Sequence, residues 1–196
     1  DFNDWQLGED VADSAFAFTP SAEAEKVDDV IASLRERAAE QQMADTGLEI
    51  GSPAPAFAMS PLDGGAKVSL EDLKGKPVVL DFFASWCQWC YVGLPTIWEV
   101  SQEYADDGLI FYAVNIEETP EQAKEMMTSL EIDPPILMDP DGAVGSDYSA
   151  TGLPYTVVID KDGNVANIHR GVPQDKNVYK TMLRADFDAI VGKESK

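Results

Sequence analysis

The chain has 196 residues, of which 44% are hydrophobic, and it carries 36 acidic against 14 basic side chains for a net charge of −22. This length suits one well-buried domain with an appendage, and the apolar content excludes wholesale disorder. The negative charge excludes nucleic acid and an anionic membrane surface as partners, because both repel an acidic protein. No apolar run approaches the roughly 18 residues that a membrane-spanning helix needs.

The first 46 residues differ from the rest, since they are rich in acids and lack a strand pattern. Thr19 can cap a helix that carries an apolar stripe on one face and ends at Gly47. We therefore expect an acidic helical N-terminal extension over 1–46 and a second domain over 47–196. The extension either docks on that domain or links it to an anchor. The first residues show no signal-peptide pattern, so we expect that any export signal or membrane anchor was removed or never present.

From residue 51 onward, strand and helix patterns alternate. In chain order they predict short strands near 57–59 and 67–69, a buried strand over 77–84 and a helix over 88–105 that contains Pro95. A strand over 109–115, a helix from Pro120, a strand over 136–138 and a short helix to about 150 follow. The chain then forms a hairpin of strands 155–160 and 165–170 and a terminal helix over 175–191. The terminal helix is expected to turn Val178, Met182, Leu183, Phe187 and Ile190 inward. This order predicts an α/β fold in which helices flank a central mixed sheet.

The chemistry of the chain is concentrated in its two cysteines, Cys87 and Cys90, which follow the predicted buried strand and begin a helix. Amide groups and the dipole at a helix start stabilise a thiolate, and a second thiol one turn on can release a captured partner. A structural zinc site would need four ligands, and covalent haem attachment would need histidine where Tyr91 stands. A structural disulfide across two residues would stabilise little. The pair therefore indicates a redox-active disulfide.

Residues from about 51 to 191 resemble the thioredoxin superfamily, specifically its ResA-like and TlpA-like redoxin branch. The resemblance is carried by the entry Gly51–Phe57, the segment Val68–Lys76 and the run Trp86–Cys90. It implies a thioredoxin-like fold with an αβ insertion between about 119 and 138. It also implies an extracytoplasmic thiol–disulfide oxidoreductase, periplasmic or tethered to a membrane in a longer precursor.

The same resemblance implies roles for individual residues. Cys87 matches the attacking nucleophile and Cys90 the resolving thiol. Pro154 matches the cis-proline of the family, which would place the backbone of Leu153 against the disulfide to pair with an extended substrate; the alternative is an ordinary trans proline.

Two acids also match family positions. Asp81, in the buried strand, matches the buried acid of thioredoxins, and Glu118 matches a glutamate that the ResA-like branch places near the thiols. A carboxyl group in an apolar site has a raised pKa and can shuttle the proton of the resolving thiol. The alternatives are a structural, hydrogen-bonded acid for Asp81 and a solvated loop charge for Glu118, where the adjacent Glu117 leaves the match ambiguous.

The tryptophans beside the cysteines are the remaining site candidates. Trp86 is expected to form part of the substrate surface, with a core tryptophan as the alternative, and Trp89 is expected to shape substrate choice. The two neutral residues between the cysteines, Gln88 and Trp89, argue against a strong oxidant.

We therefore expect a dithiol reductase that has no cofactor or metal beyond its own disulfide. Its expected partners are protein disulfides, with apocytochrome c as one candidate, and an upstream thiol donor. The alternatives are a disulfide oxidase or isomerase and, from another class, a copper-binding chaperone that uses the thiolates with His169. An ordinary strand residue is the other interpretation of His169.

Overall fold

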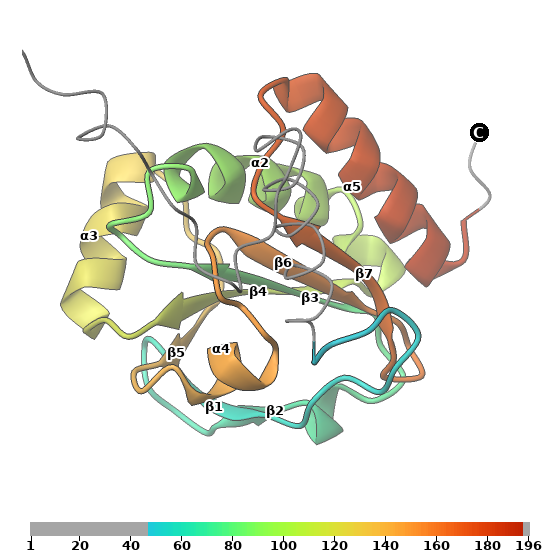
Figure 1. Cartoon of the computed structure of the whole chain (residues 1–196), viewed down its shortest axis with the longest axis horizontal. Coiled ribbons are helices and arrows are strands. Elements are labelled where there is room, and N and C mark those ends of the chain that lie inside the picture. The colour runs from blue at the N-terminus through green and yellow to red at the C-terminus, as the bar shows by residue number, and fades with distance from the viewer. Residues whose placement is uncertain (1–46, 194–196) are drawn as a thin grey trace, which may run out of the picture. The chain divides into compact units, whose positions relative to one another are not determined.

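The structure is a computed structural model of the chain and describes residues 47–193 (Figure 1). The predicted helical extension over 1–46 lies outside the described residues. Seven strands form one sheet in the order β2-β1-β5-β4-β3-β6-β7. The strands are β1 (Ala58–Pro61), β2 (Val68–Ser69), β3 (Val78–Phe83), β4 (Ile110–Ile116), β5 (Ile136–Asp139), β6 (Tyr155–Ile159) and β7 (Val165–Arg170).

Strand β3 lies inside the sheet between β4 and β6, and all six of its residues are buried. It pairs in parallel with β4 and antiparallel with β6, so the sheet is mixed, as predicted. A strand that is apolar on both faces can be buried only where helices or loops cover both faces. The order of elements from β3 onward also agrees with the prediction.

The helices are α2 (Cys90–Gln102), α3 (Pro120–Leu130), α4 (Ala143–Asp147) and α5 (Lys176–Val191). Figure 1 shows α2, α3 and α5 on one face of the sheet and α4 on the other. The core is divided in the same way. Side chains of α2, α3 and α5 pack on one face around Phe83, whereas Tyr148 and Phe57 pack on the other face around Phe82.

Local signals start two of these helices. The Thr119 side chain accepts a hydrogen bond from the backbone of Gln122, whose side chain accepts one from the backbone of Thr119, with Pro120 at the first helical position. This reciprocal cap satisfies two of the amides that a helix start leaves unpaired. Asp175 caps α5 by accepting from the backbone of Asn177 at 2.8 Å. These helices begin where the sequence predicts them.

The inward face of α5 differs from the prediction. Leu183, Phe187 and Ile190 are buried as expected, but Val178 and Met182 are 49% and 41% exposed, and Tyr179 is buried in their place. The residues Tyr179, Leu183 and Phe187 follow a spacing of four along one stripe of the helix. The sheet and α2 cover only that stripe, so the side chains next to it reach the surface.

No helix among residues 47–193 is both long and apolar enough to cross a membrane.

Candidate active site

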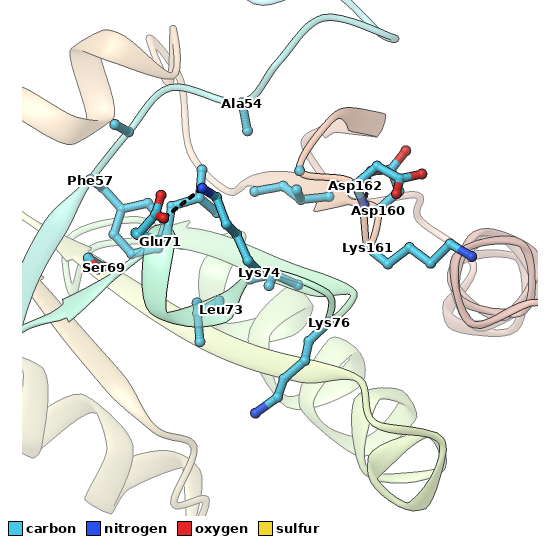
Figure 2. Close-up of a pocket in the computed structure, with 15 residues that line it drawn as sticks. Ala54, Phe57, Ser69, Glu71, Leu73, Lys74, Lys76, Asp160, Lys161 and Asp162 are labelled. Atoms are coloured by element: carbon cyan, nitrogen blue, oxygen red, sulfur yellow. Dashed lines mark hydrogen bonds and ion pairs between the residues drawn. The ribbon is translucent and has the colours of Figure 1, made fainter.

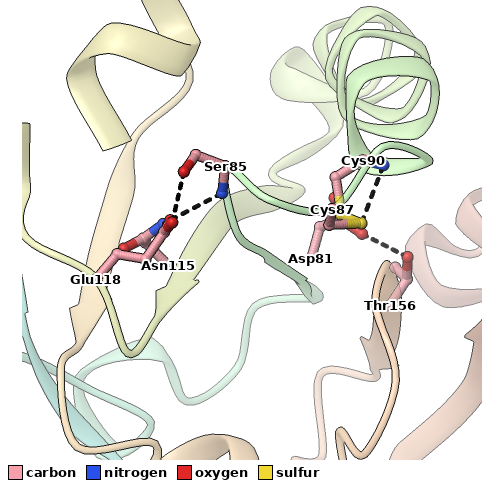
Figure 3. The surroundings of a disulfide bond; sticks show 7 residues. All are labelled: Asp81, Ser85, Cys87, Cys90, Asn115, Glu118 and Thr156. Atoms are coloured by element: carbon pink, nitrogen blue, oxygen red, sulfur yellow. Dashed lines mark hydrogen bonds between the residues drawn. A yellow bond between two sulfur atoms is a disulfide. The ribbon is translucent and has the colours of Figure 1, made fainter. Parts of the chain in front are cut away.

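Cys87 and Cys90 form a disulfide at the carboxyl end of β3 (Figure 3). Turns lead from β3 into the motif, because the Cys87 amide donates to the Ala84 carbonyl at 3.1 Å and the Cys90 amide to the Cys87 carbonyl at 3.0 Å. Helix α2 consequently begins at Cys90, two residues later than predicted. Cys87 therefore lies just before the helix, with its sulfur facing the helix start.

The two sulfurs have different surroundings. The backbone amide of Cys90 donates to Cys87 Sγ at 3.1 Å. A donor of this kind at a helix start stabilises a thiolate on Cys87 once the disulfide is reduced. Cys87 exposes 5% of its surface and Cys90 none. Cys87 is thus less accessible in the disulfide form than the motif led us to expect, but it is the more accessible of the two.

Asp81 lies on β3 among the residues surrounding the disulfide (Figure 3), and it is 1% exposed. Thr156 on β6 donates to its Oδ1 at 2.6 Å, while its Oδ2 is buried without a hydrogen-bond partner. Burial raises the pKa of Asp81 to about 7, against the smaller lowering effects of the Thr156 hydroxyl and the charge of His169. A carboxyl with this pKa exchanges its proton near neutral pH, as a proton shuttle must.

Glu118 is buried rather than solvated, so the alternative of a solvated loop charge is wrong. Its carboxylate accepts hydrogen bonds from the Ser85 amide at 2.8 Å, the Ser85 hydroxyl at 2.5 Å and the Asn115 amide at 2.8 Å. The adjacent Glu117 is exposed. Glu118 thereby ties the end of β4 to the turn that precedes Cys87.

The bond between Leu153 and Pro154 is cis, as the resemblance implied. The loop lies beside the first turns of α2, since a methyl group on Gly93 would lie 3.6 Å from Pro154 Cγ. Leu153 packs against the core cluster that contains both cysteines. Its amide and carbonyl have no hydrogen-bond partner within residues 47–193.

Both tryptophans of the motif are exposed, Trp86 at 69% and Trp89 at 53%, so the alternative of a core tryptophan is wrong. Trp89 lines a groove of about 520 Å³ with Arg170 and Met182. Trp86 lines a second groove of about 460 Å³ against α4. Leu153 lines both grooves. The exposed surface of Trp86 and Trp89 beside the cysteines thus continues into two grooves, which share Leu153 of the cis-proline loop.

A cavity of about 460 Å³ lies at the opposite end of β3, where Phe57, Leu73 and Val78 line it (Figure 2). Glu71 and Lys74 pair beside it at 2.6 Å. Its lining includes no cysteine or histidine, so it is not part of the redox site.

His169 is a residue of strand β7, as the interpretation of an ordinary strand residue predicts; it is 7% exposed and its Nε2 lies 2.6 Å from Asp186 Oδ2. Three side chains of metal-ligand type, as a copper site built on the thiolates and His169 would require, do not gather anywhere in the described part of the chain. The interpretation of His169 as a ligand therefore has no support.

Sequence reasoning missed Ser85, Asn115 and Thr156, the partners of the two buried acids. Asn115 and Thr156 are polar residues within otherwise apolar strands, a pattern that indicates a hydrogen-bonded partner in the core. The pattern does not say which partner, because each bond joins residues of different elements.

Comparison with known proteins identifies the fold and the chemistry. Residues 49–183 match the family model described as Redoxin. The chain is 34% identical over 141 residues to thioredoxin-like protein YneN of Bacillus subtilis, covering 70% of this chain and 81% of that protein. It is 30% identical over 132 residues to the thiol-disulfide oxidoreductase ResA of the same organism, covering 67% and 73%.

Among solved structures, a thiol:disulfide interchange protein of Chlorobium tepidum superimposes with a TM-score of 0.59 at 28% identity, covering 71% of this chain and 98% of that one. A dithiol motif held as a disulfide at the start of a helix, a cis-proline beside it and the extent of these matches together identify the chain. It belongs to the Redoxin family and is a thiol–disulfide oxidoreductase of the thioredoxin type.

Proposed function

We propose that this oxidoreductase works as a dithiol reductase of protein disulfides. The Cys87 thiolate attacks a substrate disulfide, forms a mixed disulfide with one substrate sulfur and expels the other as a thiolate. Cys90 then attacks the Cys87 sulfur, which closes the Cys87–Cys90 disulfide and releases the second substrate thiolate. Two electrons pass from the enzyme to the substrate, and an upstream dithiol donor returns them.

The observation that carries this proposal is the asymmetry of the two sulfurs. Cys87 is the more accessible sulfur and has the Cys90 amide as a donor, whereas Cys90 is fully buried. A nucleophile must reach its substrate, and a resolving thiol need only reach the nucleophile. The exposed tryptophans supply a surface for an extended segment of substrate, and so does the backbone of Leu153, which has no hydrogen-bond partner within the described part of the chain.

Proton transfer is assigned to Asp81. A carboxyl group whose pKa is about 7 accepts the Cys90 proton as Cys90 attacks and returns it in the next cycle. Glu118 has the different role of positioning the turn before Cys87 through its hydrogen bonds to Ser85. Its three hydrogen bonds engage both carboxylate oxygens, which favours a positioning role over proton transfer.

The reducing direction is supported by the neutral Gln88 and Trp89 between the cysteines. The likeness to the ResA-like branch supports an extracytoplasmic location and protein substrates such as apocytochrome c. A redox titration of the Cys87–Cys90 couple tests the direction. A potential near about −120 mV, typical of strong oxidants, would contradict a reductase and favour the oxidase.

Trapping tests the roles of the cysteines and identifies the substrates. The variant Cys90→Ser, expressed in its native host, is expected to hold proteins on Cys87 by mixed disulfides that a reductant releases. Cys87→Ser is the matched control and is expected to hold none. If Cys87→Ser trapped the same proteins through Cys90, the assignment of nucleophile and resolving thiol would be reversed.

A further inference from the structure

A row of polar side chains crosses the sheet beneath the disulfide. Asp81 on β3 is the register partner of Thr156 on β6, and Thr156 is the partner of His169 on β7. Directly opposite residues of neighbouring strands point to the same face of a sheet. That face is the one covered by α2 and α5, since His169 packs edge-on against Tyr179 of α5 at 6.3 Å between ring centroids.

The row continues from the sheet into α5. Asp186 lies 2.6 Å from His169 Nε2 and is 18% exposed, while Asn167 of β7 donates to the other oxygen of the same carboxylate at 2.8 Å. The row therefore begins at a fully buried acid and ends at an acid that reaches solvent. It contains the sole histidine of the chain.

We propose that His169, held by Asp186, is a positioning residue for disulfide exchange, because it places a positive charge on the buried row that begins at Asp81. The proposal rests on the role of Asp81 in the proposed function.

The charge of His169 sets the sign of the effect on Asp81, and the carboxylate of Asp186 opposes it, because a like charge disfavours ionisation of Asp81. After burial and the Thr156 hydrogen bond, the charge of His169 is the remaining influence on the pKa of Asp81, and it lowers that pKa. From α5, Tyr179 faces the row between the acids, because its pKa is raised by burial and then by the charges of Asp81 and Asp186. A positive ring favours the ionised Asp81 that can accept the Cys90 proton.

The distance sets the size of the effect. Two strand spacings separate β3 from β7 across β6, about 10 Å. At an effective dielectric constant of ~20, a full charge at that distance moves a titration midpoint by about one pH unit. A purely structural His169 would hold Asp186 in place and move no midpoint at Asp81.

The test uses the full chain with His169→Gln, which keeps a donor to Asp186 and removes the imidazole ring and its charge. The control is Asn167→Ala, which removes a hydrogen bond to the same carboxylate from the same strand and changes no charge. The carboxyl carbon of Asp81 is followed by 13C NMR from pH 4 to 10, with Asp81→Asn to identify its resonance. The rate of Cys90-dependent release of a mixed disulfide is measured over the same range.

In His169→Gln the Asp81 midpoint is expected to rise by up to about one pH unit. Release should slow by up to about tenfold at pH 6 and remain unchanged at pH 9. Asn167→Ala should match the wild type. The combined variant D81N/H169Q should have the pH profile of D81N alone.

Two results overturn the inference and leave the role of Asp81 intact. In the first, the pH profile of release for His169→Gln equals that of the wild type, while Asp81→Asn loses its pH dependence. In the second, Asn167→Ala shifts the Asp81 midpoint as much as His169→Gln does. An Asp81→Asn profile equal to the wild type overturns both proposals. If His169→Gln does not fold, the test is made on the wild-type protein, because two coupled groups show common steps in their NMR titration curves. The inference is then overturned if the titration curve of the Asp81 resonance has no step in common with that of the His169 ring.

Discussion

The cost of burying Asp81 gives a prediction that needs no substrate. The pKa of Asp81 is raised from 3.8 to about 7, chiefly by burial. Between these two pKa values the Asp81 carboxyl is protonated in the folded protein and ionised in the unfolded chain. Its contribution to the free energy of unfolding is therefore largest below about pH 4, falls as pH rises, and levels off above about pH 7. About three pH units at ~1.4 kcal/mol each give a loss of about 4 kcal/mol.

Replacing Asp81 with Asn removes this dependence. The Thr156 hydroxyl can still donate to the amide oxygen, but the amide nitrogen takes the place of Oδ2, which has no partner. An unpaired buried donor costs about 1–3 kcal/mol at every pH. The variant should therefore be no more stable than the wild type at pH 4, and more stable by about 1–3 kcal/mol at pH 8.

The assay is urea unfolding of the oxidised proteins at half-unit steps from pH 4 to 8.5. The decisive quantity is the difference in unfolding free energy between variant and wild type, which should change by about 4 kcal/mol across the series. Asp133→Asn is the matched control, because it removes the same charge from an exposed residue without a hydrogen-bond partner in the described chain. A constant difference for Asp81→Asn would refute a protonated, buried Asp81, and with it the proton transfer to Cys90.

Three further outcomes follow from the site and its supports. Glu118→Ala leaves the Ser85 and Asn115 donors without an acceptor, so urea unfolding should show a loss of about 1–3 kcal/mol; an unchanged midpoint would contradict the buried cluster. Trp89→Ala should change the free energy of unfolding by less than ~0.5 kcal/mol. It should raise KM for a protein disulfide and leave the turnover of a small aromatic disulfide unaltered. Equal losses of activity on both substrates would contradict a place for Trp89 in the substrate surface. Arg184 pairs with Glu103 through two hydrogen bonds, but both side chains are about two-fifths exposed. Arg184→Ala should therefore lower the free energy of unfolding by at most about 1 kcal/mol, and not at all in ~1 M salt. A larger loss that does not depend on salt would show that packing of the arginine stem dominates.

The redox motif and the element order could be predicted because their signals are local. The spacing of Cys87 and Cys90, the apolar run of β3 and the caps at Thr119 and Asp175 each involve residues a few positions apart. Local backbone geometry links such residues directly, so their pattern can be recognised without knowledge of any distant contact. The cis-proline was predicted differently, by resemblance to a family, because no local pattern distinguishes cis from trans at Pro154.

The helix α5 shows where a local pattern stops being sufficient. Its apolar residues define a broad stripe, and the pattern alone included Val178 and Met182 in the buried part. Only the positions of α2 and the sheet decide that Tyr179 is covered and these two are not. The width of a stripe is a local property, whereas its buried portion depends on the neighbours that pack against it.

The sequence by itself therefore determined the chemistry of this protein, namely a dithiol at a helix start after a buried strand. Tertiary structure alone decided which residues hold the two buried acids near that dithiol. Asp81 meets Thr156 across 75 positions of chain, and Ser85 meets Glu118 across 33. The register of the sheet and the packing of loops bring such pairs together, and neither is encoded in the spacing of adjacent residues.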